Sequence, residues 1–556
     1  MRLLRRTAFD ISLVIFVVSA GAGVWAAYDP ASAGAKFGRI AASILLFYLI
    51  ANLRAASPWS TAWVFSLVNA LVSFYFLMSY DWSASPVPLW KINRVGETWM
   101  QMRPAVHLPI LSADVAGAIT AMLFPFNLLT LLHSWRQRCK RAASVAFLCS
   151  LVVAVGLLLA VERGAWFGLA IGLTGWLGWT FSKKLSRLIH WPAKLIFWGG
   201  SSAILALVML ILRFPPPFLA YPLERLMTNT RLEGFTNSLH LMADYPWIGG
   251  GLGAFAGLYS RYILGIHYLY ITNSHNLFLD IGIEQGWAGL ASFVSIWIIS
   301  LILLAKGNTP EQTALRMGSA VGITTMLLHG LTEDAFYAEV GLVGVFILPG
   351  FVAALSSTAY TQSALKSPLA SSVLLSSYNP KRWSRKIFLF SVGLSFVLLA
   401  FLLQRDLVSA WHANLGAIQL AKVQLKGWPA ERVEGEKLLA HVPEAEKSFT
   451  QSLTLNPFQA TALYRLGLIA LERRDFAAAK AQLNLARQQL PYHHGISKAL
   501  GYACLWQNDL VCAEPLLAAL PEAQKELGSY AQWWKTQDRL DLSNQAKEMA
   551  IRLKSR

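Results

Sequence analysis

Three polar side chains stand beside long apolar segments, where their types could do chemistry. His275, in the stretch ITNSHNLFLDIG, carries an imidazole that titrates near neutral pH and can accept a proton. Arg231 falls in the first turn of a predicted helix, a place that disfavours a cation unless an anion is bound there. Arg163 stands between two apolar runs with hardly any loop. Plainer interpretations also fit: interfacial hydrogen bonding for His275, and a charge anchored at the membrane boundary for Arg163.

The elements that must position these residues are membrane helices. The chain has 556 residues, of which 55% are hydrophobic and 14% charged, whereas ordinary soluble domains carry about 25% charged residues. Apolar runs of roughly 17 to 22 residues can cross about 30 Å of hydrocarbon. The sequence therefore predicts an all-α fold, a polytopic bundle of about eleven spans followed by a helical-repeat domain. The predicted spans are residues 8–27, 38–55, 61–79, 111–132, 142–161, 164–181, 193–212, 287–305, 315–331, 338–357 and 387–404.

The net charge of +18 follows from membrane topology and does not require nucleic acid. More Lys and Arg fall in the gaps that are cytoplasmic when the N-terminus is inside than in the external gaps, so the positive-inside rule predicts a cytoplasmic N-terminus. The segment that begins MRLLRR is interpreted as a retained first span. An odd number of spans then places the long gap 213–286, with His275, and everything after Phe401 outside the cytoplasm.

The gap 213–286 contains two predicted helix starts. Thr228, Asn229 or Thr230 can cap a helix near Arg231 that lies along the membrane surface. Ser274 or Asn273 can cap a helix beginning at His275, which Gly286 then breaks before the eighth span. The glycine run 249–253 lacks the strand–turn–helix context of a phosphate loop and is interpreted as a flexible turn back to the membrane.

From about Pro443 the chain becomes periodic. Residues of one kind recur 34 positions apart, as in Pro457 and Pro491 or Gly467 and Gly501. This is the tetratricopeptide spacing, in which each unit is a helix–turn–helix. The predicted domains are a membrane domain over 1–404, a linker region over 405–442 and a repeat domain over 443–556. Such an array either binds a partner, for example a protein, in its groove or packs on its own membrane domain, and both interpretations stay open.

Two of the four cysteines fall in this tail. Cys504 and Cys512 flank Asn508, the predicted turn of a helical hairpin, and lie where a disulfide could persist. A disulfide and two small residues packed between helices are both compatible with the spacing.

The external stretches resemble the O-antigen ligase and Wzy-type polymerase superfamily, membrane glycosyltransferases of the GT-C class. The ligase motif is similar to a pattern in this chain: His275-Asn276 is followed, after nine residues, by Gly286-Trp287-Ala288-Gly289. The stretch ERGAWFGLA around Arg163 is similar to the family's Ser-Arg-Gly-Ala-Trp-Leu, with Glu162 in place of Ser and Phe167 where the family has Leu. A family Arg followed by a Pro- and Gly-containing stretch is matched by Arg231, Pro246, Gly249, Gly251 and Phe255. The resemblance covers about residues 110–350.

The resemblance implies an enzyme that takes a glycan from undecaprenyl pyrophosphate at the periplasmic face of a bacterial inner membrane and transfers it to an acceptor hydroxyl with inversion. It implies that His275 is the base and that Arg163 and Arg231 bind the pyrophosphate and stabilise its developing charge. Further candidates for the site are His329, Arg261, Asn276 and Glu333. Because the external loops carry no Asp-x-Asp or convincing paired-carboxylate motif, we expect neither a metal nor another cofactor.

The acceptor stays open among a lipid-A core sugar, a protein side chain and a growing glycan chain, the last of which would make the protein a polymerase. A non-enzymatic scaffold or transporter of lipid-linked glycans is the alternative from another class. A transporter would place charges deep inside its spans, whereas the middle of nearly every predicted span is apolar. The sequence therefore favours chemistry at the membrane surface.

Overall fold

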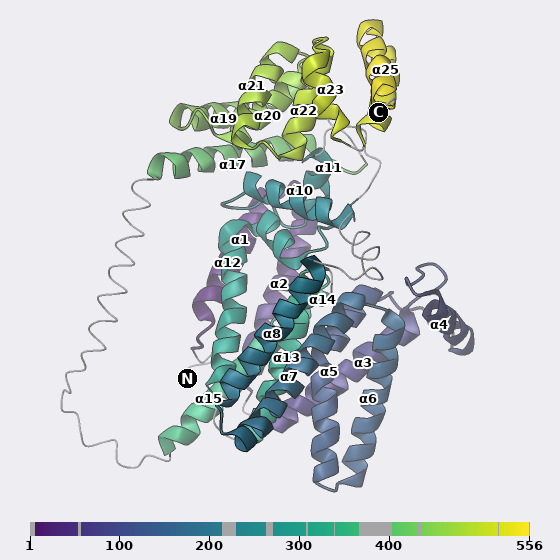
Figure 1. Cartoon of the computed structure of the whole chain (residues 1–556), viewed down its shortest axis with the longest axis vertical. Helices are drawn as coiled ribbons and strands as arrows, with labels where there is room; N and C mark the ends of the chain where they lie inside the picture. Colours follow the sequence, from purple (N-terminus) through teal and green to yellow (C-terminus); the bar gives the residue numbers. More distant parts are fainter. Residues whose placement is uncertain are drawn as a thin grey trace, which may run out of the picture.

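The structure is a computed structural model, and the part of the chain that it describes is all-α, as predicted. It describes residues 6–53, 57–213, 230–262, 271–306, 310–338, 340–365, 403–430, 435–520 and 522–554. Figure 1 shows long helices packed side by side, with shorter helices gathered at one end of the bundle.

Five helices in the described ranges are long and apolar enough to cross a membrane, so the chain is a multi-pass membrane protein. They are α2 (Pro30–Ala51), α3 (Pro58–Ser79), α5 (Ala113–Arg136), α6 (Lys140–Ala160) and α12 (Leu277–Ala305). The total of eleven spans stays a prediction. The predicted span 387–404 lies almost wholly outside the described residues.

The remaining predicted spans also fall on helices, but these helices are not both long enough and apolar enough over their described residues to count among the five. Those helices are α1 (Asp10–Ala26), α7 (Arg163–Ile189), α8 (Ala193–Arg213), α13 (Pro310–Gly330), α14 (Gly341–Gly344) and α15 (Ile347–Leu365). An additional helix, α4 (Trp90–Met102), lies in the predicted external gap between α3 and α5.

Local sequence signals explain where several of these helices begin. Asp29 precedes Pro30 at the start of α2, and its carboxylate accepts hydrogen bonds from the backbone N–H groups of Ala31 and Ser32. Ser57 likewise precedes Pro58 and caps α3. A side-chain acceptor followed by Pro satisfies or removes the first unpaired N–H groups of a helix, so both boundaries are encoded locally.

Small residues hold α7 against α13. Gly164, Gly168 and Gly172 recur every fourth residue and face α13. A Cβ atom at Gly168 would lie 2.8 Å from the carbonyl oxygen of Thr325, and one at Gly172 would lie 2.9 Å from the Val321 side chain. Membrane helices approach closely where glycines recur at this spacing, so this stripe fixes the position of the α7 N-terminus beside the end of α13.

A kink divides α12. Gly286 has φ of +70° inside the helix, and a Cβ atom there would lie 2.5 Å from the carbonyl oxygen of Trp247. The glycine run 249–253 packs against this kink: Gly250 N–H donates to the carbonyl of Ile283 at 2.7 Å. This segment is therefore a packed turn fixed by backbone contacts, and the expectation of a flexible turn is wrong.

Two short helices lie between the bundle and the tail: α10 (Thr230–Asp244) and α11 (Phe255–Tyr262). The tail consists of helices that pair in sequence order, and Figure 1 shows it on the far side of α10 and α11 from the long helices. Its helices are α17 (Gln404–Gln424), α18 (Gly435–Leu439), α19 (Pro443–Leu455), α20 (Ala460–Glu472), α21 (Phe476–Gln489), α22 (His494–Trp506), α23 (Leu510–Ala518), α24 (Ala523–Thr536) and α25 (Leu540–Lys554).

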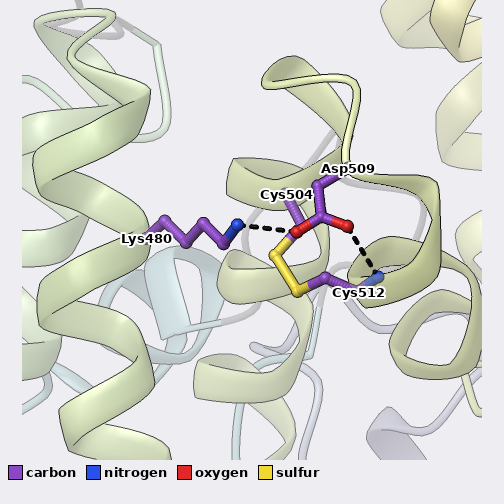
Figure 2. Close-up of a disulfide and its surroundings, with 4 residues drawn as sticks. All are labelled: Lys480, Cys504, Asp509 and Cys512. Atoms are coloured by element: carbon purple, nitrogen blue, oxygen red, sulfur yellow. Dashed lines mark hydrogen bonds and ion pairs between the residues drawn. A yellow bond between two sulfur atoms is a disulfide. The ribbon is translucent and has the colours of Figure 1, made fainter.

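The same contacts recur along the tail. Gly467 on α20 packs against Leu483 on α21, and Gly501 on α22 packs against Leu517 on α23 in the same way. The turn inside the second pair has positive φ at Asn508, the residue predicted to form it. Adjacent to this turn, Cys504 and Cys512 form a disulfide, and Figure 2 shows Lys480 of the preceding helix reaching Asp509 beside it. The alternative of two unbridged cysteines is thereby excluded.

Candidate active site

His275 lies in a tight turn that leads into α12. Its φ is +53°, and its backbone N–H donates to Asn273 Oδ1 at 3.1 Å. The helix begins at Leu277, and its cap is Asn276, whose Oδ1 accepts from the N–H groups of Phe278 and Leu279. The prediction that Asn273 or Ser274 caps a helix starting at His275 is wrong by two residues. The consequence is that His275 stands outside the helix, with its side chain 43% exposed.

Glu333 joins two residues that the sequence analysis assigns to one site, the proposed base and a proposed pyrophosphate ligand. His275 Nδ1 lies 2.8 Å from Glu333 Oε2, and Arg231 Nη2 lies 2.8 Å from Glu333 Oε1. Arg231 is in the first turn of α10, where a cation needs a nearby anion. In this structure Glu333 supplies that anion. One carboxylate from the loop after α13 thus holds the imidazole and the guanidinium on its two oxygens.

The contact between His275 and Glu333 shifts the pKa of both groups. The hydrogen bond to Glu333 raises the pKa of His275 above its usual value, although burial opposes this. Burial by itself would raise the pKa of Glu333, but the hydrogen bond from His275 and the positive charges of His275 and Arg231 outweigh it, so that this pKa is lowered. The hydrogen bond therefore favours the protonated imidazole and the ionised carboxylate together, and the attraction is strongest when His275 carries a proton.

A further contact ties the His275 turn to the same loop. Asn276 Nδ2 donates to the carbonyl of Leu331 at 3.1 Å, while Arg231 Nη1 approaches the carbonyl of Thr332 at 3.4 Å. Residues 331–338, between α13 and α14, therefore meet both the α10 N-terminus and the start of α12. Three segments far apart in sequence converge here.

Arg163 is at the edge of this arrangement. It is the first residue of α7, is exposed, and forms no ion pair with any residue in the described ranges. Its neighbour Gly164 packs against the Thr332 side chain, so the α7 N-terminus borders the loop that carries Glu333.

His329 and Glu162 form a second, buried pair beside that loop. His329 has no exposed surface, and its Nδ1 lies 3.6 Å from Glu162 Oε1. Burial and the neighbouring charge of Asp114 raise the pKa of Glu162 to about 8. Because His275 is partly exposed and His329 is fully buried, only His275 of the two presents a ring to solvent. The side chain of Arg261 lies outside the described part of the chain.

A comparison with family models identifies the segment that holds three of these residues. Residues 146–294 match the Wzy_C family model, O-antigen ligase. The matched segment contains Arg163, Arg231 and His275 and ends before Glu333. A match of this kind indicates a function of the ligase or polymerase type, with glycosyltransferase activity on lipid-linked glycans. No curated protein matches the chain.

Sequence reasoning missed a polar cluster that lies next to the His275 turn and the Glu333 loop. Lys36 Nζ pairs with Glu284 Oε2 at 2.7 Å and lies 3.7 Å from the centre of the Tyr337 ring. Tyr337 Oη accepts from Gln285 Nε2 at 2.7 Å. The sequence feature that could have predicted this cluster is Asp280, Glu284 and Gln285, three polar residues at helical spacing among the apolar residues at the start of α12.

This cluster also affects the loop of Glu333. Burial raises the pKa of the adjacent Asp334 to about 6, although Lys36 opposes the shift. Asp280 is buried, and its Oδ1 accepts the N–H of Ser274 in the His275 turn. The polar cluster therefore supports both the turn and the loop.

Among the described residues, the one group with the types and spacing of metal ligands lies far from this site in the tail. It consists of Cys504, Asp509 and Cys512. Both sulfur atoms are used by the disulfide (Figure 2), so this group has no thiolate to offer a metal.

Proposed function

We propose that the chain transfers a glycan from undecaprenyl pyrophosphate to an acceptor hydroxyl, with inversion, at the periplasmic face of a bacterial inner membrane. The observation that carries the proposal is the convergence of Arg231 and His275 on Glu333. This convergence brings Arg231, a candidate phosphate ligand, close to His275, a candidate base. Transfer from a pyrophosphate carrier requires both groups near one point.

In this proposal His275 is the general base. Its Nδ1 faces Glu333, so Nε2 is the nitrogen that accepts the proton of the acceptor hydroxyl. The hydroxyl oxygen forms the new bond to the anomeric carbon as the bond from that carbon to the pyrophosphate oxygen breaks. Glu333 stabilises the imidazolium that results. General-base catalysis of this type contributes about 10²–10⁴-fold in rate.

Arg231 binds the leaving pyrophosphate. A guanidinium has five N–H donors, and its contacts with Glu333 and the Thr332 carbonyl use two of them. The side chain is 45% exposed, so its other donors can reach phosphate oxygens as negative charge develops. Arg163, exposed at the α7 N-terminus beside Thr332, is proposed as the second pyrophosphate ligand, and no metal takes part.

The proposed orientation has the N-terminus in the cytoplasm and the tail in the periplasm. The distribution of Lys and Arg supports it. The disulfide between Cys504 and Cys512 also supports it, because disulfides persist in oxidising compartments. The tail is proposed to be a tetratricopeptide-type array, in keeping with its recurring Gly–Leu contacts.

The test is glycan transfer by the purified full chain in detergent, with an undecaprenyl-pyrophosphate-linked oligosaccharide and envelope acceptors. We expect His275→Ala to lower the transfer rate by about 10²–10⁴-fold and Arg231→Ala by about 10²-fold. Matched controls are His107→Ala and Arg94→Ala, which replace exposed residues of the α3–α5 segment. The labelled product then separates a ligase acting on lipid-A core from a protein glycosyltransferase or a polymerase.

Two results would overturn the proposal. If His275→Ala and Arg231→Ala transfer glycan as fast as their controls, the site is elsewhere. If the wild-type chain binds the lipid-linked glycan and releases none, it is a transporter or scaffold for that lipid.

A further inference from the structure

We propose that the tail positions Arg231, and that Arg465 on α20 is the positioning residue. This inference rests on the proposed function, because it assigns the tail a part in the same transfer. The tail packs on its own chain, through α10 and the residues that follow it.

A buried ion pair joins the tail to α10. Arg465 Nη2 lies 2.7 Å from Asp244 Oδ2, and Thr461 Oγ1 donates to Asp244 Oδ1 at 2.9 Å. Asp244 and Arg465 are each almost fully buried. Tyr245 and Tyr464 flank the guanidinium, whose carbon lies 6.0 Å and 5.3 Å from their ring centres. Such a pair holds its two residues in one relative geometry, because moving either residue would leave a buried charge without its partner.

Other contacts hold the adjoining segment. The rings of His240 on α10 and His493 before α22 are 4.6 Å apart. Asn414 Oδ1 on α17 accepts the backbone N–H groups of Trp247 and Ile248, at 3.1 Å and 3.2 Å. Arg465, His493 and Asn414 of the tail thus contact α10 and the residues that follow it.

The segment that the tail contacts is connected to both Arg231 and the helix beside His275. Asp244 and Arg231 occupy opposite ends of α10, a rigid rod of 15 residues that is about 22 Å long. On its other side the same segment is bonded to α12: Trp287 N–H donates to the Pro246 carbonyl at 2.8 Å. The tail therefore holds α10 at a fixed position relative to the helix that begins beside His275.

Arg465 is remote from the reacting atoms, so it can affect the reaction only through the position of Arg231. A displacement of about 1 Å at a catalytic group can cost on the order of 10²-fold in rate. Releasing the far end of α10 would let Arg231 move relative to Glu333 and the pyrophosphate. We expect Arg465→Met to lower the transfer rate by about 10–100-fold for this reason.

The first measurement is hydrogen–deuterium exchange of residues 230–244 in the full-length chain. Arg465→Met should speed exchange in α10 by at least about tenfold, and Arg465→Lys, which keeps the charge, should restore part of the protection. The matched control is Arg473→Met, which breaks the exposed pair with Glu446 inside the tail. Asp244→Asn is the milder variant if Arg465→Met does not fold. Unchanged exchange in Arg465→Met and Asp244→Asn would overturn the proposal.

The second measurement is a double-mutant cycle on transfer. If Arg465 acts through Arg231, Arg465→Met should have little further effect in the Arg231→Ala background. An equal loss in both backgrounds would mean a general structural role and would overturn the proposal. A wild-type chain that transfers no glycan would refute the proposed function, while the exchange experiment would still decide whether Arg465 anchors α10.

Discussion

Glu333 Oε2 lies 2.8 Å from His275 Nδ1, although 58 positions separate the two residues in sequence. The contact directs one imidazole nitrogen to a carboxylate and leaves the other for chemistry. The ligase-like match ends at residue 294, so this carboxylate comes from outside the matched segment. The reactivity of His275 therefore depends on how α13 and its following loop pack beside α12.

Glu333→Gln should move the pH dependence of transfer. Glu333 raises the pKa of His275, and the base must be neutral to accept a proton, so activity falls as pH drops through that pKa. The amide removes the negative charge and weakens the hydrogen bond, which lowers the pKa of His275. The acid limb of the kcat/KM profile should therefore shift to lower pH, while the maximal rate falls because the imidazolium loses its partner. An acid limb that stays in place would show that His275 is not the titrating base.

Gly168→Leu should separate α7 from α13. Its side chain would meet the Thr325 backbone, which cannot give way as a flexible side chain could. Overpacking of this kind costs about 1–3 kcal/mol and should displace Arg163 at the α7 N-terminus. Thermal unfolding in detergent and the transfer rate measure the two effects. Gly175→Leu on the same helix is the control, because a Cβ atom there has no neighbour within 4 Å. Equal unfolding temperatures for the two variants would contradict the packing argument.

Gly286→Ala should destabilise the kink of α12. Residue 286 has φ of +70°, and an added Cβ would also meet the Trp247 carbonyl oxygen at 2.5 Å. Gly253→Ala is the comparison, because Gly253 also has φ of +70° but has open space at its Cβ. We expect Gly253→Ala to cost about 1 kcal/mol and Gly286→Ala at least about 2 kcal/mol. Unfolding free energies that are equal for the two would mean that the approach of Trp247 to the kink contributes nothing.

Removing the disulfide should destabilise the tail and leave the membrane domain intact. Cys504 and Cys512 are 8 positions apart, and closing so short a loop stabilises a fold by about 2.5 kcal/mol in the chain-entropy model. The double variant Cys504→Ser/Cys512→Ser should expose the tail to proteolysis at lower temperature. Replacing the free Cys139 by Ser is the control. A tail equally resistant with and without the bridge would show that helix packing alone sets its stability.

Local patterns in the sequence determined much of the helical framework. Apolar runs predicted the long helices, because a segment that meets lipid must be apolar along its length. The recurrence at Gly467 and Gly501 predicted the paired helices of the tail, since each unit repeats one short-range packing contact. Arg231 stood out as a cation in the first turn of a predicted surface helix, and His275 as a titrating ring just before a membrane helix.

Only the tertiary structure decided which of these residues meet. No spacing predicts that Glu333 lies between Arg231 and His275, because the pairing depends on how α10, α12 and α13 pack together. The same is true of Asp244 and Arg465, whose burial requires the tail to fold back on α10. Local sequence specifies where helices start and which faces are apolar, whereas contacts between distant side chains arise from the packing of whole helices.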